Sequence, residues 1–586
     1  MQRLCRWLDQ GLPRASLFAA IALLALCGLA FFLQLGGLGL MDKTEGLFVE
    51  VPRQMLLSGD WVTPRWNGER FFDYPVWGYW MVGLSFRWFG ISEWAARLPA
   101  ALAASASVLA TYGLVLALGA PQERPSQRVG RAALAGGILA LSPGWIGWAH
   151  SSVTDMFLAS AMAMALLGFA LAYWRRDDRG LRRLGHGALA LFCGVAVLAK
   201  GPVGLLLPGL VIIVFLLLRG QLWSEVRQTP WFPLLALFLG VTLPWYVLAT
   251  RANGFTFLAR FIGFSNLERF TSVLYSHPGP PWFYLPWVVL LLLPWSLYLP
   301  VALVRLRFWR LSVWRSASAA EAVPLFALVW LVLIVAFFSS AATKLPGYIL
   351  PALPGAALLV GLLFAPLSHP QEDLASARHP LWCLSGWFNA VLLGLMAIAA
   401  VLAPNWIEQD PSYPGFARAV ASSGLPWLLA LPLALTVIAL VVLLRRGPAA
   451  LPWLWVPNGL GFAAVLALVV PGLVPLMDRE RLLPIRALAR QAAASAQPGE
   501  PLLVAGYKRY SVVFYSGRPV LFVYDPRDAL EQLGADPAPT VLLLASDAEL
   551  LEFGVRPGDA ALLGRSDAHR LIRLPRTTLQ QLEARS

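Results

Sequence analysis

The strongest constraint on this chain is a succession of apolar runs, each close to the length that crosses a membrane. A bilayer core requires a helix of about 20 apolar residues. Because lipid offers the backbone no hydrogen-bond partners, such runs fold as helices. We therefore predict a mainly α, polytopic membrane fold with about 13 transmembrane helices. The predicted spans are 16–39, 97–119, 131–149, 155–174, 186–200, 202–218, 231–250, 283–304, 323–340, 347–366, 381–403, 425–445 and 452–476.

The composition excludes a soluble globular protein. Hydrophobic residues make up 58% of the chain and charged residues only 13%, whereas soluble domains are about a quarter charged. The net charge of +14 has an ordinary origin in such a chain, because cytoplasmic loops of membrane proteins are rich in Lys and Arg. We therefore read the charge as topological and expect no nucleic-acid partner.

The arginines predict the orientation in the membrane. If the N-terminus is cytoplasmic and the aromatic segment 76–90 lies in the interface without crossing, the arginine-rich loops fall inside, as the positive-inside rule requires. These loops hold Arg124, Arg128 and Arg131, then Arg175, Arg176, Arg179, Arg182 and Arg183, then Arg305, Arg307, Arg310 and Arg315, and finally Arg445 and Arg446. If 76–90 crossed, every later loop would invert. We therefore expect a juxtamembrane helix there.

The chain divides into two parts. Residues 1–477 form the predicted transmembrane domain, whose largest loops, 41–96 and 251–282, lie on the outer face. Residues 478–586 alternate short apolar strands with helical stretches, which predicts a small extracytoplasmic α/β domain. The expected strands are 502–505, 520–523 and 541–545, and the expected helices are 479–494 and 547–553.

Charged residues that are scarce elsewhere gather on the predicted outer face. Each of these residues can also be explained by a structural role, because a lysine at a span end can snorkel and an aspartate can cap a helix. Acids and bases together at one membrane surface favour a site that holds an anionic group during an acid–base step. The residues concerned are Asp42, Glu45, Glu50, Asp73, Asp155, Lys200, Arg260, Arg269 and Lys344.

Five stretches, in this order, resemble the bacterial polyprenyl-phosphate-sugar glycosyltransferases of the GT-C fold, the relatives of protein O-mannosyltransferase and of the lipid A aminoarabinose transferase. The similarity covers about residues 15–360. The stretches are Met41-Asp-Lys-Thr-Glu-Gly-Leu-Phe-Val-Glu-Val51 with Arg53-Gln-Met55 and Ser58-Gly-Asp-Trp-Val-Thr-Pro64, Phe71-Phe-Asp-Tyr-Pro75 with Gly78-Tyr-Trp80, Thr154-Asp155, Leu198-Ala-Lys-Gly-Pro-Val-Gly204 and Lys344-Leu-Pro-Gly-Tyr-Ile-Leu-Pro351.

The resemblance implies an enzyme of the bacterial inner membrane that glycosylates lipid A or another envelope component on the periplasmic face. The donor would be a sugar on polyprenyl phosphate, the reaction would be inverting, and the acceptor could be a lipid, a glycan or a protein. Membrane lipids would be further partners. No cofactor follows from the sequence, and a divalent metal stays open, with Asp73 and His277 as candidate ligands.

The resemblance also assigns site residues by position. The catalytic acids are Asp42, Glu45 and Asp155, and the residues on the donor phosphate are Lys200, Arg269, Lys344, Tyr348 and Tyr74. Two positions depart from the family pattern. Thr44 stands where the family has the aspartate of an Asp-Glu pair, so the base is either Asp42 or Glu45, and Tyr74 replaces a lysine after Asp73. Asn266 replaces a histidine of the aminoarabinose branch, which speaks against bound zinc and against assignment to that branch.

Two other functions compete with a transferase. A transporter or lipid-linked sugar flippase also has many spans, but it would carry polar groups near mid-membrane, whereas the charges here gather at one surface. A catalytically inactive anchor is the third hypothesis, because of Thr44 and Tyr74.

Overall fold

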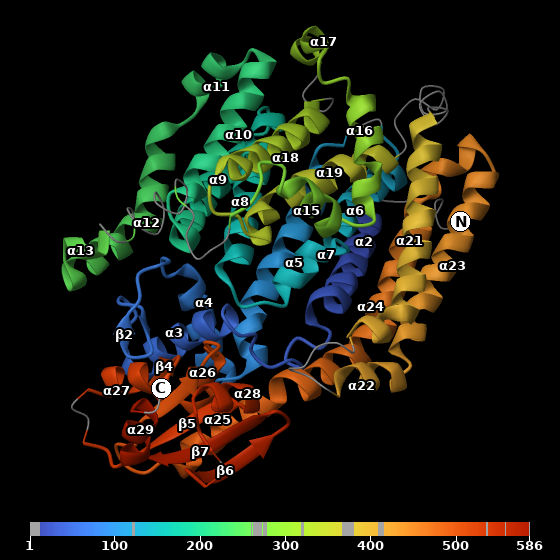
Figure 1. Ribbon diagram of the computed structural model, residues 1–586. Coiled ribbons are helices and arrows are strands. Elements are labelled where there is room, and N and C mark those ends of the chain that lie inside the picture. Colours follow the sequence, from blue (N-terminus) through green and yellow to red (C-terminus); the bar gives the residue numbers. More distant parts are fainter. Residues whose placement is uncertain are drawn as a thin grey trace.

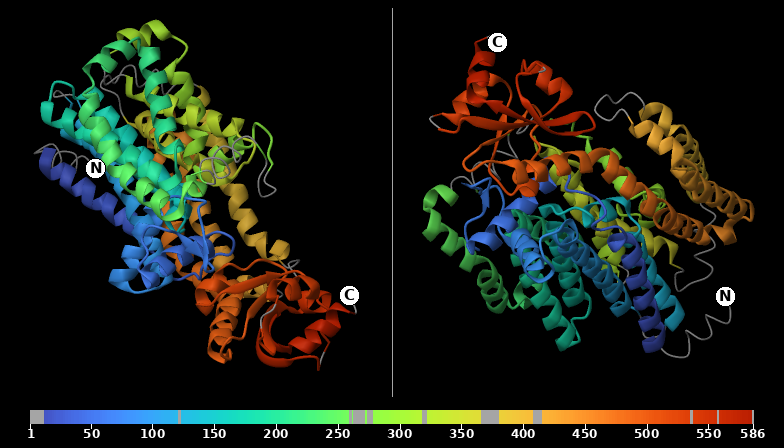
Figure 2. Two further views of the ribbon diagram at one scale, coloured as in Figure 1. Left: turned by 90° about the vertical axis from the view of Figure 1, so that its left-hand side faces the viewer. Right: turned by 90° about the horizontal axis from the view of Figure 1, so that it is seen from below.

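The computed structural model describes residues 12–119, 123–258, 261, 272, 278–317, 322–365, 380–407, 415–534, 537–556 and 558–584. Figure 1 shows a large helical bundle and, beyond one end of it, a small sheet flanked by helices that contains the C-terminus. The left view of Figure 2 shows the sheet at that same end of the bundle, and the right view, from below, shows it to one side of most of the helices.

The described residues include 10 helices that are long and apolar enough to cross a membrane. They are α2 with η1 (Leu12–Cys27, Gly28–Phe32), α5 (Glu93–Ala117), α8 (Thr154–Trp174), α9 (Arg179–Lys200), α12 (Trp231–Asn253), α18 (Val323–Ser340), η5 with α19 (Pro346–Ala352, Leu353–Phe364), α21 (Pro380–Ile407), α23 (Leu425–Arg445), and η6, α24, η7 and α25 in succession (Pro448–Trp453, Trp455–Met477, Asp478–Leu482, Leu483–Ser495).

Three more apolar segments bring the bundle close to the predicted count. Helices α6 and α7 (Pro125–Ala140, Pro143–Ala149) form one pair bent by 61°, and α15 with η3 and α16 (Tyr284–Leu291, Trp295–Tyr298, Leu299–Leu306) forms another bent by 110°. Helix α10 (Val203–Arg219) has only 17 residues. Every predicted span falls on one of these segments, so the structure is consistent with the expected count of about 13.

Two segments form the centre of the bundle. Of their most apolar windows, 89% is buried in α8 and 94% in η5–α19, against 11% in the stretch from Pro448 to Ser495. A helix surrounded by other helices places the residues at its ends firmly. Asp155 lies in the first turn of α8 and Lys200 in the last turn of α9.

The first loop is itself folded. It contains α3 (Glu45–Ser58), a hairpin of β1 (Arg65–Trp66) and β2 (Glu69–Arg70), and α4 (Trp77–Phe89). The hairpin turns at Asn67 and Gly68, whose φ angles of 53° and 84° are typical of a type I′ Asn-Gly turn. Helix α4 lies where the sequence predicts the juxtamembrane helix, and Gly90, with φ 81°, ends it.

The remaining helices of the bundle are short connections. They are α11 (Leu222–Gln228), α13 (Phe255–Leu258), α17 (Leu311–Ser316) and α22 (Phe416–Ser422). In Figure 1, α11 and α17 lie at the end of the bundle farthest from the sheet.

The C-terminal sheet has five strands in the order β4-β3-β5-β7-β6. The first three are parallel, and β7 and β6 are antiparallel to their neighbours. The strands expected near 502, 520 and 541 are present, whereas the β6–β7 hairpin was not predicted. The elements are β3 (Leu502–Ala505), α26 (Ser511–Ser516), β4 (Val520–Val523), α27 (Pro526–Leu533), β5 (Thr540–Ser546), α28 (Asp547–Glu552), β6 (Ala561–Ser566), β7 (His569–Pro575) and α29 (Arg576–Glu583).

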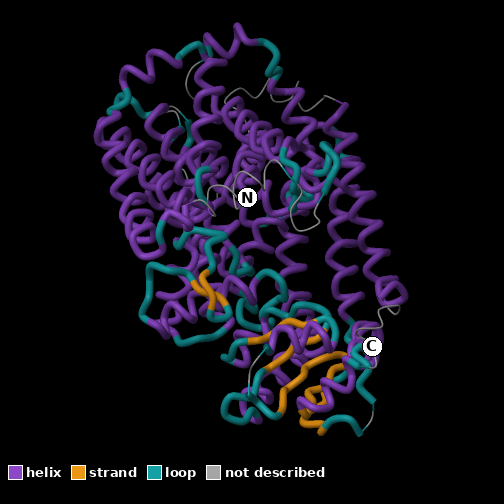
Figure 3. Tube along the Cα trace, turned by 60° about the vertical axis from the view of Figure 1, so that its left-hand side comes forward, coloured by secondary structure: helices purple, strands orange, loops and turns teal. Residues whose placement is uncertain are grey.

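The first-loop hairpin docks on the edge of this sheet, and Figure 3 shows the two strand-containing regions next to each other. The Asn67 side chain donates to the Val520 carbonyl and accepts from its N–H, both at 2.9 Å, so it pairs with edge strand β4 as a neighbouring strand would. The Trp66 ring lies 4.9 Å from Tyr510 and 6.1 Å from Phe522. The two parts of the molecule are therefore held together by specific contacts.

The stability of the C-terminal domain is expected to depend on pH through His569. Burial, and then the charge of Arg509, lower the pKa of this histidine to about 4. The unfolded chain binds a proton near pH 6.5 while the fold does not, so stability falls as pH drops from about 6.5 to 4, by up to about 3 kcal/mol. Unfolding midpoints of the full chain at pH 7.5 and 5.0 measure this slope. His569→Gln should show a smaller drop, and an equal drop in both proteins would contradict the assignment.

Candidate active site

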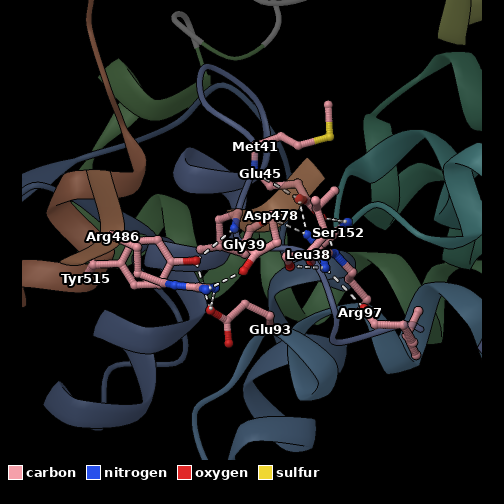
Figure 4. A network of polar contacts seen from close by, with 12 residues as sticks. Leu38, Gly39, Met41, Glu45, Glu93, Arg97, Ser152, Asp478, Arg486 and Tyr515 are labelled. Atoms are coloured by element: carbon pink, nitrogen blue, oxygen red, sulfur yellow. Dashed lines mark hydrogen bonds and ion pairs between the residues drawn. The ribbon is translucent and has the colours of Figure 1, made fainter. Parts of the chain in front are cut away.

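The first polar cluster joins the first loop to the membrane helices (Figure 4). Glu45, the first residue of α3, is fully buried and pairs with Arg97 of α5 through contacts of 2.7 and 2.9 Å. Its oxygens also accept from the backbone N–H groups of Met41 at 3.1 Å and Ser152 at 2.9 Å. A carboxylate has about four lone-pair sites, so the protein itself occupies all those of Glu45.

Arg97 is saturated in the same way. A guanidinium has five N–H donors, and those that Glu45 leaves are taken by the carbonyls of Leu35, Leu38 and Gly39 at 3.1, 2.6 and 2.9 Å. Burial by itself raises the pKa of Glu45, but the charge of Arg97 and the hydrogen bonds hold that pKa below its usual value. Both charges therefore fix the chain at the entrance to the first loop.

A second network in Figure 4 ties the C-terminal region to the same segment. Arg486 of α25 pairs with Glu93 at 3.2 Å, at the start of α5, and with Asp478 at 2.6 Å. The Tyr515 hydroxyl of α26 donates to Glu93 at 2.9 Å and accepts from the N–H of Leu40 at 2.8 Å. The segment before the first loop is thus held from the membrane side and from the C-terminal side.

Asp42 faces the C-terminal domain. Its Oδ1 accepts from the N–H of Ser511, the first residue of α26, at 2.9 Å. Burial raises the pKa of Asp42, against the hydrogen bonds of Ser511 and the charge of Arg509, which lower it. Thr44, the family's aspartate position, is exposed at the start of α3.

Asp155 and Lys200 form a close pair between α8 and α9. Their Oδ1 and Nζ atoms lie 2.5 Å apart, and their side chains are 20% and 13% exposed. The Lys200 ammonium also lies 4.8 Å from the ring centre of Tyr348, in η5. Three segments of the bundle therefore meet at one cation.

Aromatic residues of the first loop interact with the Asp155–Lys200 pair and with one another. Tyr74 interacts electrostatically with Lys200, and its ring lies 5.0 Å from that of Phe48. Asp73 interacts electrostatically with Tyr79 and with Tyr510 of the C-terminal domain. Burial, and then the charges of Tyr74 and Asp73, raise the pKa of Tyr79.

Lys344 occupies a different setting from Lys200. It is 5% exposed, and its ammonium donates to the carbonyls of Ser339, at 3.0 Å, and of Ala341, at the end of α18. The next residue, Leu345, donates its N–H to the Tyr284 hydroxyl at 3.2 Å. Lys344 thus satisfies carbonyls that the end of a helix leaves without partners.

Two predicted site residues, Arg269 and His277, lie outside the described residues. Within the described part of the chain, no three His, Cys, Asp or Glu side chains are grouped so that they could hold a metal ion. The metal ligands expected at Asp73 and His277 therefore stay predictions.

Two family models match the chain. Residues 73–248 match the dolichyl-phosphate-mannose-protein mannosyltransferases, and residues 495–586 match the C-terminal domain of the cyanobacterial RgtA-type glycosyltransferases. The first match contains Asp155 and Lys200, and the second contains the loop that approaches Asp42.

Proteins similar to most of the chain agree with these models. The undecaprenyl phosphate-alpha-4-amino-4-deoxy-L-arabinose arabinosyl transferase of Pseudomonas paraeruginosa is 32% identical over 401 residues, which are 67% of this chain and 67% of that protein. The chain belongs to the GT-C family of polyprenyl-phosphate-sugar glycosyltransferases. The Pseudomonas aeruginosa protein of the same name is 35% identical over 346 residues, and the match spans 58% of its length.

A solved structure shows the same GT-C fold. The crystal structure of ArnT from Cupriavidus metallidurans bound to undecaprenyl phosphate superposes with a TM-score of 0.72 at 24% identity, covering 94% of this chain and 97% of that one. The apo form of the same protein superposes with a TM-score of 0.73. The fold expected from the sequence is therefore confirmed, including a small sheet domain after the membrane helices.

For this GT-C chain, sequence analysis missed the partners of the acids. Arg97 was counted inside an apolar run, although a charge in such a run is costly and indicates a buried partner. Arg486, Tyr510 and Tyr515 were also missed, because their partners near the first loop lie 393 or more positions away. The separation of Asp42 and Ser511 is 469. No local sequence pattern predicts contacts between residues so far apart in the chain.

Proposed function

We propose that the chain transfers a sugar from a polyprenyl phosphate to an acceptor. The observation that carries this proposal is the Asp155–Lys200 pair, with its 2.5 Å contact and the Tyr348 ring beside the ammonium, in a member of this family. The relatives are named for undecaprenyl phosphate and 4-amino-4-deoxy-L-arabinose, which makes that lipid-linked sugar the first donor to test.

The donor phosphate is placed at Lys200. A cation at the leaving group stabilises the negative charge that develops there, and in a site of low dielectric this contributes strongly. Asp155 holds the ammonium in position between α8 and α9, and the hydroxyls of Tyr348 and Tyr74 complete the polar surface around it. Lys344 and Arg269 are the other proposed phosphate contacts, and Lys344 has part of its donor capacity used by helix carbonyls.

The three acids are proposed to have different roles. Glu45 is a positioning residue, because Arg97, Met41 and Ser152 use its lone pairs. Asp155 orients Lys200. Asp42 is the general base, since Ser511 is its only hydrogen-bond donor among the described residues, which leaves lone pairs free to take a proton. A raised pKa also suits proton removal near neutral pH.

In the proposed reaction, Asp42 accepts the proton of the acceptor's nucleophile as that atom bonds to the anomeric carbon. The bond from the anomeric carbon to the phosphate oxygen breaks on the opposite face, and its electron pair leaves with polyprenyl phosphate. One displacement of this kind inverts the anomeric centre. The nucleophile approaches from the side of the C-terminal domain, which Asp42 contacts.

We place this site on the outer, periplasmic face of the inner membrane. Helix α17 contains Arg315 and directly follows the loop with Arg307 and Arg310. It lies at the end of the bundle farthest from the C-terminal sheet (Figure 1), so the positive-inside rule supports this orientation. The domain expected at 478–586 would then cover the site from outside. Among the described residues, no observation favours the flippase alternative.

The deciding experiment supplies undecaprenyl phosphate-linked, radiolabelled aminoarabinose to proteoliposomes with the full chain and a bacterial lipid extract as acceptor source. A labelled product other than the donor lipid is expected. Donor that changes leaflet without forming such a product would contradict a transferase and support a flippase.

Replacing Lys200 by methionine should weaken the binding of undecaprenyl phosphate by about 10- to 100-fold, because a charge-assisted hydrogen bond contributes about 1.5–3 kcal/mol. Competition against labelled undecaprenyl phosphate measures this. The matched control is Arg227→Met, an exposed cation on α11, which should bind as the wild type does. Unchanged binding in Lys200→Met would remove Lys200 from the phosphate site.

A further inference from the structure

The C-terminal sheet has a topological switch point that faces the first loop. The chain leaves β3 toward β4 on one side, and it leaves β5 toward β6 and β7 on the other side. In open α/β sheets, ligands bind outside the carboxyl ends of the strands at such a point. The loop after β3, residues 506–510, occupies this place, and its next residue, Ser511, contacts Asp42.

Cations and tyrosines gather there from both parts of the molecule. Lys43 of the first loop lies 4.4 Å from the ring centre of Tyr507, and Arg509 lies 5.5 Å from the same ring on the domain side. Lys508 lies 5.7 Å from the ring of Tyr524, which directly follows β4. The Tyr507 and Tyr524 side chains are 44% and 64% exposed. We call Lys43, Tyr507, Lys508, Arg509 and Tyr524 the switch-point patch.

The carboxylates around this patch are used by backbone N–H groups. Glu549 accepts from Tyr507 at 3.2 Å and from Ser546 at 2.6 Å, and Asp528 accepts from Tyr524 at 2.9 Å. Of the three cations in the patch, only Arg509 has a carboxylate partner among the described residues, Glu549 at 4.0 Å. Neither Lys43 nor Lys508 forms an ion pair within the described part of the chain, so the patch carries uncompensated positive charge.

Arg509 differs from the saturated Arg97. Its Nη2 donates to Nε2 of His569 at 2.9 Å, while its Nε is buried without a hydrogen-bond partner among the described residues. Because Nε2 of His569 accepts, the ring hydrogen is on Nδ1, and this atom is likewise buried and unpartnered, in a residue only 4% exposed. Buried donors without acceptors are uncommon and call for an explanation such as a bound group.

The backbone of Lys43 is also unusual. Its φ angle is 66°, in the left-handed region that L residues other than Asn and Asp seldom adopt. The neighbours hold it there, since Asp42 is bonded to Ser511 and Met41 to Glu45. Such conformations persist where the surroundings fix them, and they cluster at ligand-binding sites. The strained conformation brings the ammonium to the ring of Tyr507.

We infer that the switch-point patch binds the anionic headgroup of the acceptor, a saccharide that carries phosphate or carboxylate. Lysines and a partly satisfied guanidinium bind such groups by charge-assisted hydrogen bonds, and the exposed tyrosine rings add flat contact surface. The inference rests on the proposed transferase function, and it explains why Asp42 and the patch adjoin. The headgroup anion is held by the domain and the first loop while its nucleophile reaches Asp42.

The test uses the full chain in phosphatidylcholine nanodiscs, with glucose 6-phosphate and glucose as soluble probes in titration calorimetry. Wild type should bind glucose 6-phosphate at least tenfold more tightly than glucose. Lys43→Asn with Lys508→Met should lower that affinity about tenfold, and asparagine suits the left-handed position of Lys43. The matched control is Arg565→Gln, an exposed cation on β6, which should bind as wild type does.

Equal affinity for the two probes, or a double variant that binds as wild type does, would overturn the inference. If phosphatidylglycerol in the nanodiscs suppressed the binding of glucose 6-phosphate, the cations would be assigned to the lipid surface. That result would also overturn the inference. Undecaprenyl phosphate binding in the same preparations separates the two proposals. If that lipid binds and glucose 6-phosphate does not, only the patch inference fails. If the sugar phosphate binds and the lipid does not, the transferase proposal fails, and the patch is an anionic-sugar site that no longer serves an acceptor.

Discussion

Replacing Asp42 by asparagine is expected to lower sugar transfer by about 10²- to 10⁴-fold, the usual contribution of a general base. Asparagine keeps an oxygen that can accept from the N–H of Ser511, so the fold should persist while proton removal is lost. The measurement is the initial rate of transfer at saturating donor, with undecaprenyl phosphate binding recorded in the same samples. Binding of the donor lipid should not change.

The pH profile sharpens this prediction. The base works only when it is ionised, so wild-type activity should fall as pH drops through the pKa of Asp42, which burial raises above its usual value. Glu69→Gln, an exposed acid in the same loop, is the matched control and should keep both the rate and the profile. An Asp42→Asn protein that transfers at the wild-type rate would exclude Asp42 as the base and return attention to Asp155.

Arg97→Met is expected to have the largest effect on stability, about 3–5 kcal/mol, because it leaves the buried Glu45 carboxylate without its cation. It also removes the donors that bind the carbonyls of Leu35, Leu38 and Gly39. The yield of monodisperse protein and its unfolding midpoint in detergent measure the loss. Arg87→Met, on an exposed arginine of α4, should change stability by less than about 0.5 kcal/mol.

A double variant keeps this prediction testable if the single variant does not fold. Combining Arg97→Met with Glu45→Gln removes both charges and leaves an amide oxygen for the N–H of Ser152. It should be more stable than Arg97→Met alone, since an unpaired buried charge costs more than a neutral pair. If the double variant is as unstable as the single one, the cost lies in the carbonyls that Arg97 binds.

The sequence predicted the membrane part of the fold well for a physical reason. A transmembrane span can be identified from its length and apolarity alone, and each predicted run lies on a helix of the bundle. The β6–β7 hairpin was not predicted because β6 is an exposed edge strand that contains Gly564 and a bulge, while Arg570 and Arg573 interrupt the apolar residues of β7. Neither strand has the apolar run that revealed β3 and β5.

The candidate site was predictable in its residue types but not in its connections. The pairing of Asp155 with Lys200 joins two stretches that the family resemblance had already singled out. The saturation of Glu45 by Arg97 and the approach of Ser511 to Asp42 depend on how distant segments pack, which no local pattern records. These contacts separate the three acids into proposed base, positioning residue and lysine partner, a division that the sequence left open.

The contact between the Asn67 amide and β4 determines whether the C-terminal domain can be produced separately. It occupies the hydrogen-bonding edge of β4 at Val520, an edge that would otherwise be a template for a strand of another molecule. Cut away from the first loop, the domain would present that edge to its own copies and self-associate. The C-terminal piece is thus a poor unit for separate expression, because one side chain of the first loop covers this edge of its sheet at Val520.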